Sequence, residues 1–536
     1  MALIRPSTRR AALALTMLLL VLLALMAAHG GARAQTQASK CVRITLLQVN
    51  DVYQFMPVDR GTSGGLARVS TLRKQIMKDS PNTLFLFSGD TISPSVESIK
   101  LKGQQMIDAW NQIGLDYATL GNHEFDFGPE ELLKRMKESR FQWLAANVVD
   151  AKGNSFGGMP PFVVRDVGGI RVGFFGILLP ATMTTSRPGP DVKILDSCET
   201  ARRVVPQMRA AGAKIIIALT HLSMREDKQL AHCVPDIDLI IGGHEHTLLQ
   251  SLANRTPIFK MTADARQLGR YDLTVDAATG KLQSIDWEVI PVNDKVEEDP
   301  QFASVTEKYK EFLASYGEMV GRTSVRLDAR SEANRTGETN VGDFIADAFR
   351  QTMAADVALI NGGSIRADTI FEPGPLSKHD VLAILPFGTE VVKIEVTGAT
   401  LRKTLEHGVS QSGRGEEPGR FPQVSGLRFS FDASQPAGHR IKKLTVGGHP
   451  LDDRKTYTLA TNVYLIGGGD DYDMLKGARQ LTKQGEAQID SEILRKAIAS
   501  VQAIAPQTDG RIEWLNKPVE DNQTECITVI NAAGSK

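Results

Sequence analysis

The spacing of apolar and polar residues predicts an alternating fold for the first half of the chain. Between residues 41 and about 295, short apolar segments rich in β-branched side chains alternate with longer amphipathic stretches. Alternation of this kind predicts an α/β domain. The segments with the length and flanking turn residues of strands are VRITLLQV, TLFLFSGD, YATLGNH, FQWLAANV, RVGFFGIL, KIIIALTH and DLIIGGH.

A second pattern begins near residue 299. Residues 299–320 have a helical period and charge on one side, which predicts a helix that links two domains. Beyond it, ETNVGDFIADAFRQTMAADVALINGG predicts a helix and then a strand, and mixed patterns continue to about residue 515. Residues 410–420 are a loop by their glycine, proline and charge content. Because 536 residues are too many for one core, we expect at least two domains.

The first 34 residues have the order of a signal peptide. The basic stretch RPSTRR precedes the apolar run AALALTMLLLVLLALMAA, and Ala32 and Ala34 then fit a cleavage site. We therefore expect the mature chain to start at Gln35 and to be exported to the periplasm or the extracellular space. An uncleaved anchor is the alternative. No later apolar run is long enough to suggest a membrane span.

Composition excludes some partners. The chain has 62 basic and 62 acidic residues, which gives no electrostatic reason to expect nucleic acid or an anionic membrane. The oligomeric state cannot be inferred from the sequence.

All four cysteines lie in the exported part, where disulfides persist. They are Cys41, Cys198, Cys233 and Cys526. Cys198 and Cys233 flank one predicted helix–strand–helix stretch, so we prefer this pair. Four free thiols are the alternative.

Polar residues gather where several of the predicted strands end. In open α/β sheets such positions converge beyond the carboxyl ends of the strands. Oxygen and imidazole donors in one set favour Zn, Mn or Co, whereas Ca or Mg prefer oxygen alone. The candidate metal ligands are Asp51, Asp90, Asn122, His221, His244 and His246.

The blocks GDTIS, GNHEFDFG, THLS and GGHEH, in this order, resemble the metal blocks of the calcineurin-like metallophosphatases. Within that superfamily the chain resembles the exported two-domain 5'-nucleotidases over almost all residues after 40. The resemblance implies a four-layer α/β sandwich, with two packed mixed sheets flanked by helices, and then a smaller α/β nucleotide-binding domain. The implied limits are 1–34 for the signal peptide, 41–298 for the dimetal domain, 299–321 for the linker helix and 322–520 for the substrate-binding domain.

The resemblance also implies two divalent metal ions, which could be Zn, Mn or Co. Asp90 would bridge them, one ion being completed by Asn122, His221 and His244 and the other by Asp51 and His246.

His123, beside Asn122, resembles the family's catalytic histidine, and Asp126 would orient it and favour its charged form.

One position departs from the family pattern. The first block is commonly Asp-x-His, and here it is Asp51, Val52 and Tyr53. A phenol is a weak ligand near neutral pH because its pKa is ~10. Three outcomes are open: Tyr53 binds as phenolate, a water replaces the imidazole, or the site holds its metal weakly. We favour the water.

The second half carries the blocks RTGETNVGD, NGGSIR, LPFG and YLIGGGDDY. By resemblance they supply arginines and an asparagine near the phosphate and base, two rings around the base and an acid for the ribose. Arginine forks bind phosphate, and aromatic faces stack flat bases. The residues at the matching positions are Arg335, Asn361, Arg366, Phe387, Tyr464 and Asp470.

The leading hypothesis is an exported phosphohydrolase that converts nucleoside monophosphates to nucleosides and phosphate. Nucleotide diphosphate sugars and 2',3'-cyclic nucleotides are further candidate substrates. The alternatives are a thiosulfohydrolase that releases sulfate on the same scaffold, and a nucleotide-binding protein whose metal site has decayed. The retained base clamp argues against the thiosulfohydrolase. Residues 299–320 are a candidate hinge between the domains.

Overall fold

The computed structural model describes residues 40–413, 418–483 and 486–517. The predicted signal peptide and Cys526 lie outside these ranges. Among the described residues, no helix combines the length and apolar character that a membrane crossing requires.

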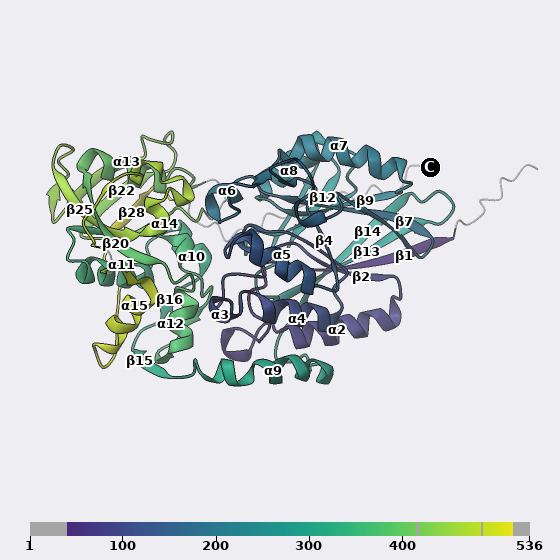
Figure 1. Cartoon of the computed structure of the whole chain (residues 1–536), viewed down its shortest axis with the longest axis horizontal. Coiled ribbons are helices and arrows are strands. Elements are labelled where there is room, and N and C mark those ends of the chain that lie inside the picture. The colour runs from purple at the N-terminus through teal and green to yellow at the C-terminus, as the bar shows by residue number, and fades with distance from the viewer. Residues whose placement is uncertain (1–39, 414–417, 484–485, 518–536) are drawn as a thin grey trace, which may run out of the picture.

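The first half of the chain folds around two six-stranded mixed sheets (Figure 1). The first has the order β14 (Leu282–Pro291), β13 (Gln267–Asp276), β1 (Cys41–Val49), β2 (Thr83–Phe87), β3 (Tyr117–Thr119) and β4 (Gln142–Leu144). The second has the order β11 (Leu249–Ala253), β12 (Thr256–Lys260), β10 (Leu239–Gly242), β9 (Ile215–His221), β7 (Ile170–Leu178) and β6 (Val163–Val167). A short pair joins β5 (Val148–Asp150) to β8 (Val192–Ile194).

The central strands are buried on both faces because successive side chains enter different cores. Leu84 and Leu86 of β2 pack between the two sheets, in one cluster with Ile217 of β9. The intervening Phe85 and Phe87 belong to the cluster that packs against the helices. The near-continuous apolar runs seen in the sequence follow from this double burial.

Helices cover the outer face of each sheet, which confirms the predicted four-layer arrangement. In Figure 1, α7 and α8 lie above the sheets, and α2, α4 and α9 lie below them. The helices of this domain are α2 (Leu66–Asp79), α3 (Ser98–Leu101), α4 (Gln104–Ile113), α5 (Pro129–Glu138), α6 (Thr182–Thr185), α7 (Ser197–Ala210), α8 (Met224–Cys233) and α9 (Ala303–Ala314).

Two sequence-based expectations about elements were wrong in extent. The predicted strand FQWLAANV is divided between β4 and β5, because the Asn147 side chain bonds the backbone of Leu178 and turns the chain there. The predicted linker helix over 299–321 extends only over α9. Its Val305 and Tyr309 are buried in the core of the first domain, and the chain after it enters β15 (Met319–Thr323).

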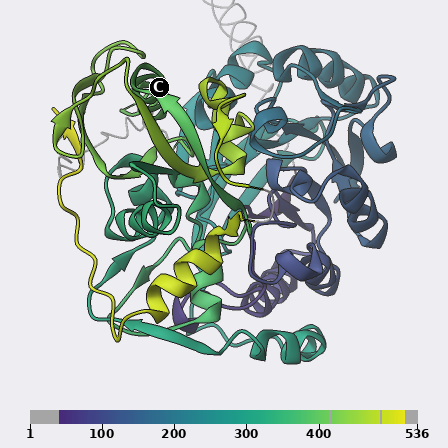
Figure 2. The ribbon, with the colours of Figure 1, turned by 60° about the vertical axis from the view of Figure 1, so that its left-hand side comes forward.

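The second domain is smaller and also α/β. Figures 1 and 2 show it, in green to yellow, lying beside the first domain. Its main sheet has the order β21 (Pro422–Ser425), β17 (Val357–Asn361), β25 (Thr456–Asn462), β20 (Glu390–Thr397) and β26 (Arg479–Gln480), with β27 (Gln488–Ile489) also paired to β20. A second sheet has the order β24 (His449–Pro450), β23 (Ile441–Val446), β22 (Leu427–Asp432) and β28 (Ile512–Leu515).

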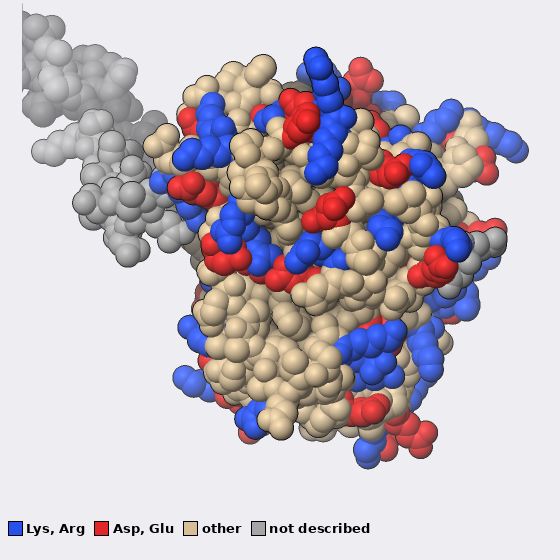
Figure 3. Space-filling model, turned by 90° about the vertical axis from the view of Figure 1, so that its left-hand side faces the viewer, with Lys and Arg blue, Asp and Glu red and all other residues tan. Residues whose placement is uncertain are grey.

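Shorter pairs and helices complete this domain. The pairs are β15 with β19 (Gly374–Ser377) and β16 (Leu327–Asp328) with β18 (Ile370–Phe371). The helices are α10 (Ser331–Thr336), α11 (Asn340–Thr352), α12 (Lys378–Ile384), α13 (Gly398–Gly408), α14 (Val463–Ile466) and α15 (Asp490–Ala499). On the face that Figure 3 shows, basic and acidic side chains are interspersed, in keeping with their equal totals.

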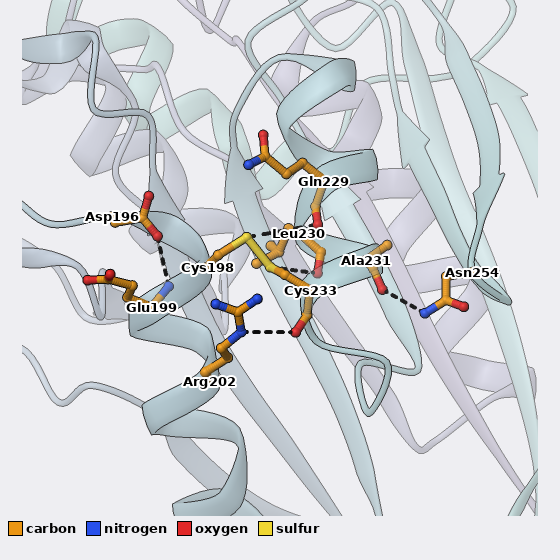
Figure 4. The surroundings of a disulfide bond; sticks show 9 residues. All are labelled: Asp196, Cys198, Glu199, Arg202, Gln229, Leu230, Ala231, Cys233 and Asn254. Carbon is orange, nitrogen blue, oxygen red and sulfur yellow. Dashed lines mark hydrogen bonds between the residues drawn. A yellow bond between two sulfur atoms is a disulfide. The ribbon is translucent and has the colours of Figure 1, made fainter.

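The preferred disulfide is confirmed. Cys198 at the start of α7 is bonded to Cys233 at the end of α8 (Figure 4). The Arg202 guanidinium donates to the Cys233 carbonyl at 3.4 Å, which also ties the two helices together. The bond therefore fastens the helices that cover the second sheet.

We expect replacement of Cys198 and Cys233 together by serine to lower the free energy of unfolding by about 2–4 kcal/mol, because the 35-residue separation closes a long loop in the unfolded chain. Denaturant titration of the oxidised protein and the double variant measures this. As a control, adding reductant should leave the free energy of unfolding of the double variant unchanged, because it has no disulfide to reduce. Equal stability of the oxidised protein and the double variant would contradict the expectation.

Candidate active site

The predicted metal ligands lie at the carboxyl ends of strands from both sheets of the first domain. Strands β1, β2 and β3 are parallel neighbours in one sheet, and β9 and β10 are parallel neighbours in the other. The ends of adjacent parallel strands share an edge, so the side chains that follow them converge. These are Asp51 after β1, Asp90 after β2, Asn122 after β3, His221 at the end of β9, and His244 and His246 after β10.

The backbone at the strand ends is in an unusual conformation. Asp51, Asp90 and His244 have φ values of 51°, 67° and 83°, in the left-handed region that non-glycine residues rarely adopt. Such strain persists only where the surroundings enforce it, and it clusters at functional sites. A glycine allows a close approach nearby: a Cβ on Gly121 would lie 2.1 Å from Asp90 Oδ1. Gly121, the glycine of GNHE, therefore cannot be replaced by a residue with a side chain unless Asp90 moves.

The donor atoms fit a cation. Asn122 Oδ1 is buried and has no hydrogen-bond partner among the described residues, and the contact of the buried His221 Nε2 is with another predicted ligand. His221 Nε2 lies 3.2 Å from Asp90 Oδ2. His221 Nδ1 is 2.8 Å from the Ser88 carbonyl, an arrangement that leaves Nε2 to face the site. Buried polar atoms without partners are costly unless a ligand satisfies them.

Charge in the site is unevenly distributed. Burial raises the pKa of Asp51 to about 7, with charged His221 opposing the rise. Burial alone would lower the pKa of His221, but the Asp90 carboxylate raises it to about 10. Burial holds the pKa of His244 and of His246 well below the ordinary value, which leaves these imidazoles neutral, the form that binds metal.

Tyr53 reaches the ligand atoms directly. Its hydroxyl oxygen lies 3.3 Å from Asp51 Oδ1, 3.2 Å from Asp90 Oδ2 and 3.0 Å from His246 Nε2. Arg366, from the second domain, donates to the same oxygen at 2.9 Å. Burial and the Asp90 carboxylate raise the pKa of Tyr53 well above its ordinary value, a direction that a cation beside the phenol reverses.

His123 is held by a chain of hydrogen bonds. Its Nδ1 is 2.7 Å from Asp126 Oδ2, as the sequence predicted. Asp126 Oδ1 in turn accepts from the Ser186 hydroxyl at 2.7 Å, a contact that sequence reasoning missed. Ser186 follows α6, far along the chain, and no motif marked it. These two hydrogen bonds fix the orientation of the imidazole, whose Nε2 lies 4.0 Å from Asp90 Oδ2.

Glu124 was also missed, although it lies inside the quoted block GNHE. Its carboxylate accepts from the backbone N–H groups of Asp90 at 2.9 Å, of Thr91 at 2.6 Å and of Gly121. Glu124 therefore fastens the loop after β2 to the loop after β3. Both loops carry predicted ligands.

A buried ammonium group joins the other two ligand loops. Lys260 Nζ donates to the Gly243 carbonyl at 2.9 Å and to the Leu222 carbonyl, which follow β10 and β9. It also forms ion pairs with Glu245 and, at 2.9 Å, with Asp227. Lys260 is fully buried, so its charge depends on these partners. Sequence reasoning missed this residue because nothing local distinguishes it at the end of β12.

A cavity of about 410 Å³ opens beside these residues and is shared by both domains. All six residues predicted in the second domain line it: Arg335, Asn361, Arg366, Phe387, Tyr464 and Asp470. From the first domain it is lined by Asp90, Asn122, His123, Asp126, His244 and His246. Asp51 and His221 do not line the cavity, but each has a ligand atom within 4.8 Å of one of Asp90.

Within the cavity the two domains touch. The Phe387 ring stacks on the His123 ring, with 5.9 Å between centroids and 29° between planes. The Tyr464 hydroxyl donates to Asp470 Oδ1 at 2.8 Å, and Asp470 Oδ2 accepts from Asn361 Nδ2 at 2.8 Å. The aromatic faces, a carboxylate and two arginines therefore lie beside the donor set in one enclosure. Such an enclosure suits a ligand that has a flat ring at one end and an anionic group at the other.

Two family models match the chain in tandem: calcineurin-like phosphoesterase over residues 44–248 and the 5'-nucleotidase C-terminal domain over residues 319–477. The chain is 30% identical to the 5'-nucleotidase of Diplobatis ommata, over 91% of this chain and 92% of that protein. It is also 30% identical to the trifunctional nucleotide phosphoesterase YfkN of Bacillus subtilis. That match covers 89% of this chain but only 35% of YfkN, which is the longer protein. The crystal structure of a 5'-nucleotidase precursor from Thermus thermophilus matches with a TM-score of 0.83 and 29% identity, over 89% of this chain and all of that one.

We expect Lys260→Met to lower the free energy of unfolding by about 3–5 kcal/mol, because it leaves Asp227 and Glu245 without their buried counter-charge. Denaturant titration measures the loss. Lys443→Met, at an exposed position, is the matched control and should change stability by less than about 0.5 kcal/mol. Adding Asp227→Asn and Glu245→Gln should recover part of the loss, and no recovery would contradict the electrostatic explanation.

Proposed function

Because this chain belongs to the 5'-nucleotidase family of the calcineurin-like metallophosphatases, we propose that it hydrolyses nucleoside 5'-monophosphates to nucleosides and phosphate. The observation that carries the proposal is the shared cavity, which places a base-and-ribose clamp and two arginines beside a cation-binding donor set. A nucleotide has a flat base, a diol and a phosphate, and each finds a chemically matched partner there.

We assign the metal-binding role to the six strand-end residues as predicted, with Asp90 shared between two divalent ions. Ions bound there polarise the phosphate oxygens and lower the pKa of the attacking water. The mixed oxygen and imidazole donors suit Zn, Mn or Co. The unpartnered Asn122 Oδ1 and the 3.2 Å approach of His221 Nε2 to Asp90 Oδ2 support this assignment.

We assign to His123 the stabilisation of charge that develops on the phosphate and the leaving oxygen. His123 lines the cavity, and its Nδ1 is held by Asp126 Oδ2 at 2.7 Å. Asp126 is itself held by Ser186, so the ring is fixed before substrate arrives. Arg335 and Arg366 complete the cationic surroundings of the phosphate.

We assign nucleoside recognition to the second domain. Phe387 and Tyr464 offer faces for the base, and Asp470, together with Asn361, offers acceptors and donors for the ribose. The first domain contributes a contact here too, because the Tyr464 hydroxyl lies 3.5 Å from the Thr184 carbonyl. Nucleotide diphosphate sugars and 2',3'-cyclic nucleotides carry the same base and ribose and remain candidate substrates.

The alternatives fit the cavity less well. A thiosulfohydrolase acting on a peptide arm has no use for two aromatic faces beside a carboxylate. A nucleotide-binding protein with a decayed metal site has no use for the buried, unpartnered Asn122 Oδ1. We retain the proposal that the protein acts after export, in the periplasm or outside the cell.

We expect the mature protein to release phosphate from AMP with Mn²⁺ or Zn²⁺, and to lose this activity after chelation until metal is restored.

Phe387→Ala and Tyr464→Ala should each raise KM for AMP about 5- to 100-fold, which corresponds to a stacking contribution of about 1–3 kcal/mol. p-Nitrophenyl phosphate, which lacks a base, is the matched control, and its KM should change little. Binding of AMP without turnover, under any divalent metal, would instead favour the nucleotide-binding protein.

We expect His123→Ala to lower kcat about 10²- to 10⁴-fold with AMP. Ser186→Ala removes only the hydrogen bond that holds Asp126 and should lower kcat by about 10-fold, with KM nearly unchanged. Steady-state kinetics at saturating metal measures both. Ser186→Thr keeps the hydroxyl and serves as the control. A Ser186→Ala enzyme with wild-type kcat would show that Asp126 needs no such support.

A further inference from the structure

We propose that the phenol oxygen of Tyr53 is a fourth protein ligand at the first metal position, beside Asp51, Asp90 and His246. The inference rests on the proposed function, which assigns metal ions to this site. It replaces the water that the sequence alone favoured. The geometry around the oxygen carries it.

The spacing of the four donor atoms matches a coordination shell. Adjacent ligand atoms that lie about 2.0–2.2 Å from a metal are about 2.8–3.6 Å from one another in octahedral or tetrahedral arrangements. The phenol oxygen lies 3.3 Å from Asp51 Oδ1, 3.2 Å from Asp90 Oδ2 and 3.0 Å from His246 Nε2. Asp51 Oδ1 and His246 Nε2 are themselves 3.6 Å apart. These four of the six separations among the four atoms fall within the expected range, and Asp90 and His246 form no ion pair within 4.0 Å.

The phenol oxygen is a corner of this shell and does not fill its centre. If it took the place of the cation, the other ligand atoms would surround it. From the three distances among them, Asp51 Oδ1 and His246 Nε2 subtend an angle of only about 70° at the oxygen, so both lie on one side of it. The phenol oxygen therefore lies at the edge of this set of atoms and not at its centre.

The surroundings of Tyr53 hold its oxygen in this position. The side chain is 5% exposed, and its backbone N–H donates to Asp264 Oδ1 at 3.0 Å. Arg366 donates to the phenol oxygen at 2.9 Å, and its guanidinium lies over the ring, 5.2 Å from the centroid. A side chain fixed from two directions is preorganised as a ligand should be.

With Tyr53 included, the two metal positions differ in chemistry. The first has three oxygen donors and one imidazole, from Tyr53, Asp51, Asp90 and His246. The second has the oxygens of Asp90 and Asn122 and two imidazoles. Oxygen-rich sets favour harder ions, so the first position is the better site for Mn²⁺ or ferric iron, and the second for Zn²⁺.

Ferric iron is the probe, because a phenol oxygen bound to it gives a visible charge-transfer band. We expect the mature wild-type protein loaded with Fe³⁺ to show that band, and Tyr53→Phe and Tyr53→His to lack it. Equilibrium dialysis against Mn²⁺ with elemental analysis should give two ions per wild-type chain. Tyr53→Phe should weaken one of them at least 10-fold. Tyr53→His should hold two, since the imidazole is itself a ligand.

Tyr117→Phe, which changes a buried tyrosine away from the site, is the matched control and should keep the band. A wild-type protein without the band overturns the inference, as does a Tyr53→Phe protein that holds both Mn²⁺ ions at wild-type affinity. One ion in the wild type and two in Tyr53→His would show that the phenol blocks the position, which also overturns it. None of these readings uses a substrate, so a protein that shows the band but never cleaves AMP would refute only the proposed function.

Discussion

Two buried carboxylates, Asp51 and Asp90, lie close together where the two sheets of the first domain meet, and the structure around them compensates for that proximity. Both side chains are almost fully buried, and the Asp90 carboxylate opposes ionisation of Asp51. His221 and the N–H groups around them supply the opposite charge, and the proposed metal ions would add to it. Several supporting features follow from this constraint. The left-handed backbone aims the carboxylates, Glu124 binds the loops that carry them, and Lys260 fastens the loops that face them.

The sequence predicted the parts of this arrangement that are local. Each ligand follows an apolar strand within a few residues, so strand and ligand are read from one short segment. The parts that were missed depend on contacts between distant segments. Ser186 meets Asp126 only because α6 folds back over the site, and Lys260 meets two loops because β12 lies beside β10. The predicted linker helix was longer than α9 for a similar reason. The charge pattern of residues 299–321 does not show where the helix stops packing against the first domain.

Tyr53 could be predicted only in part from the sequence. The sequence showed that a phenol stands where the family has an imidazole, but the position of its oxygen depends on Asp264 and on Arg366 from the other domain. No local pattern includes either partner. The domain limits and the roles of the site residues likewise stay predictions, because geometry places these side chains together without showing what each does in the reaction.

Through its contact between the two domains, Arg366 couples the binding of the nucleotide to the binding of metal. It lines the cavity proposed to receive the nucleotide, and it also donates to the Tyr53 oxygen, which lies beside Asp51, Asp90 and His246. A substrate phosphate that draws the guanidinium toward itself changes the field at those donors. Linkage then requires reciprocity: whatever factor the nucleotide imposes on metal affinity, the metal imposes on nucleotide affinity. The enzyme's apparent affinity for its substrate is thereby tied to the free concentration of metal in the compartment where it works.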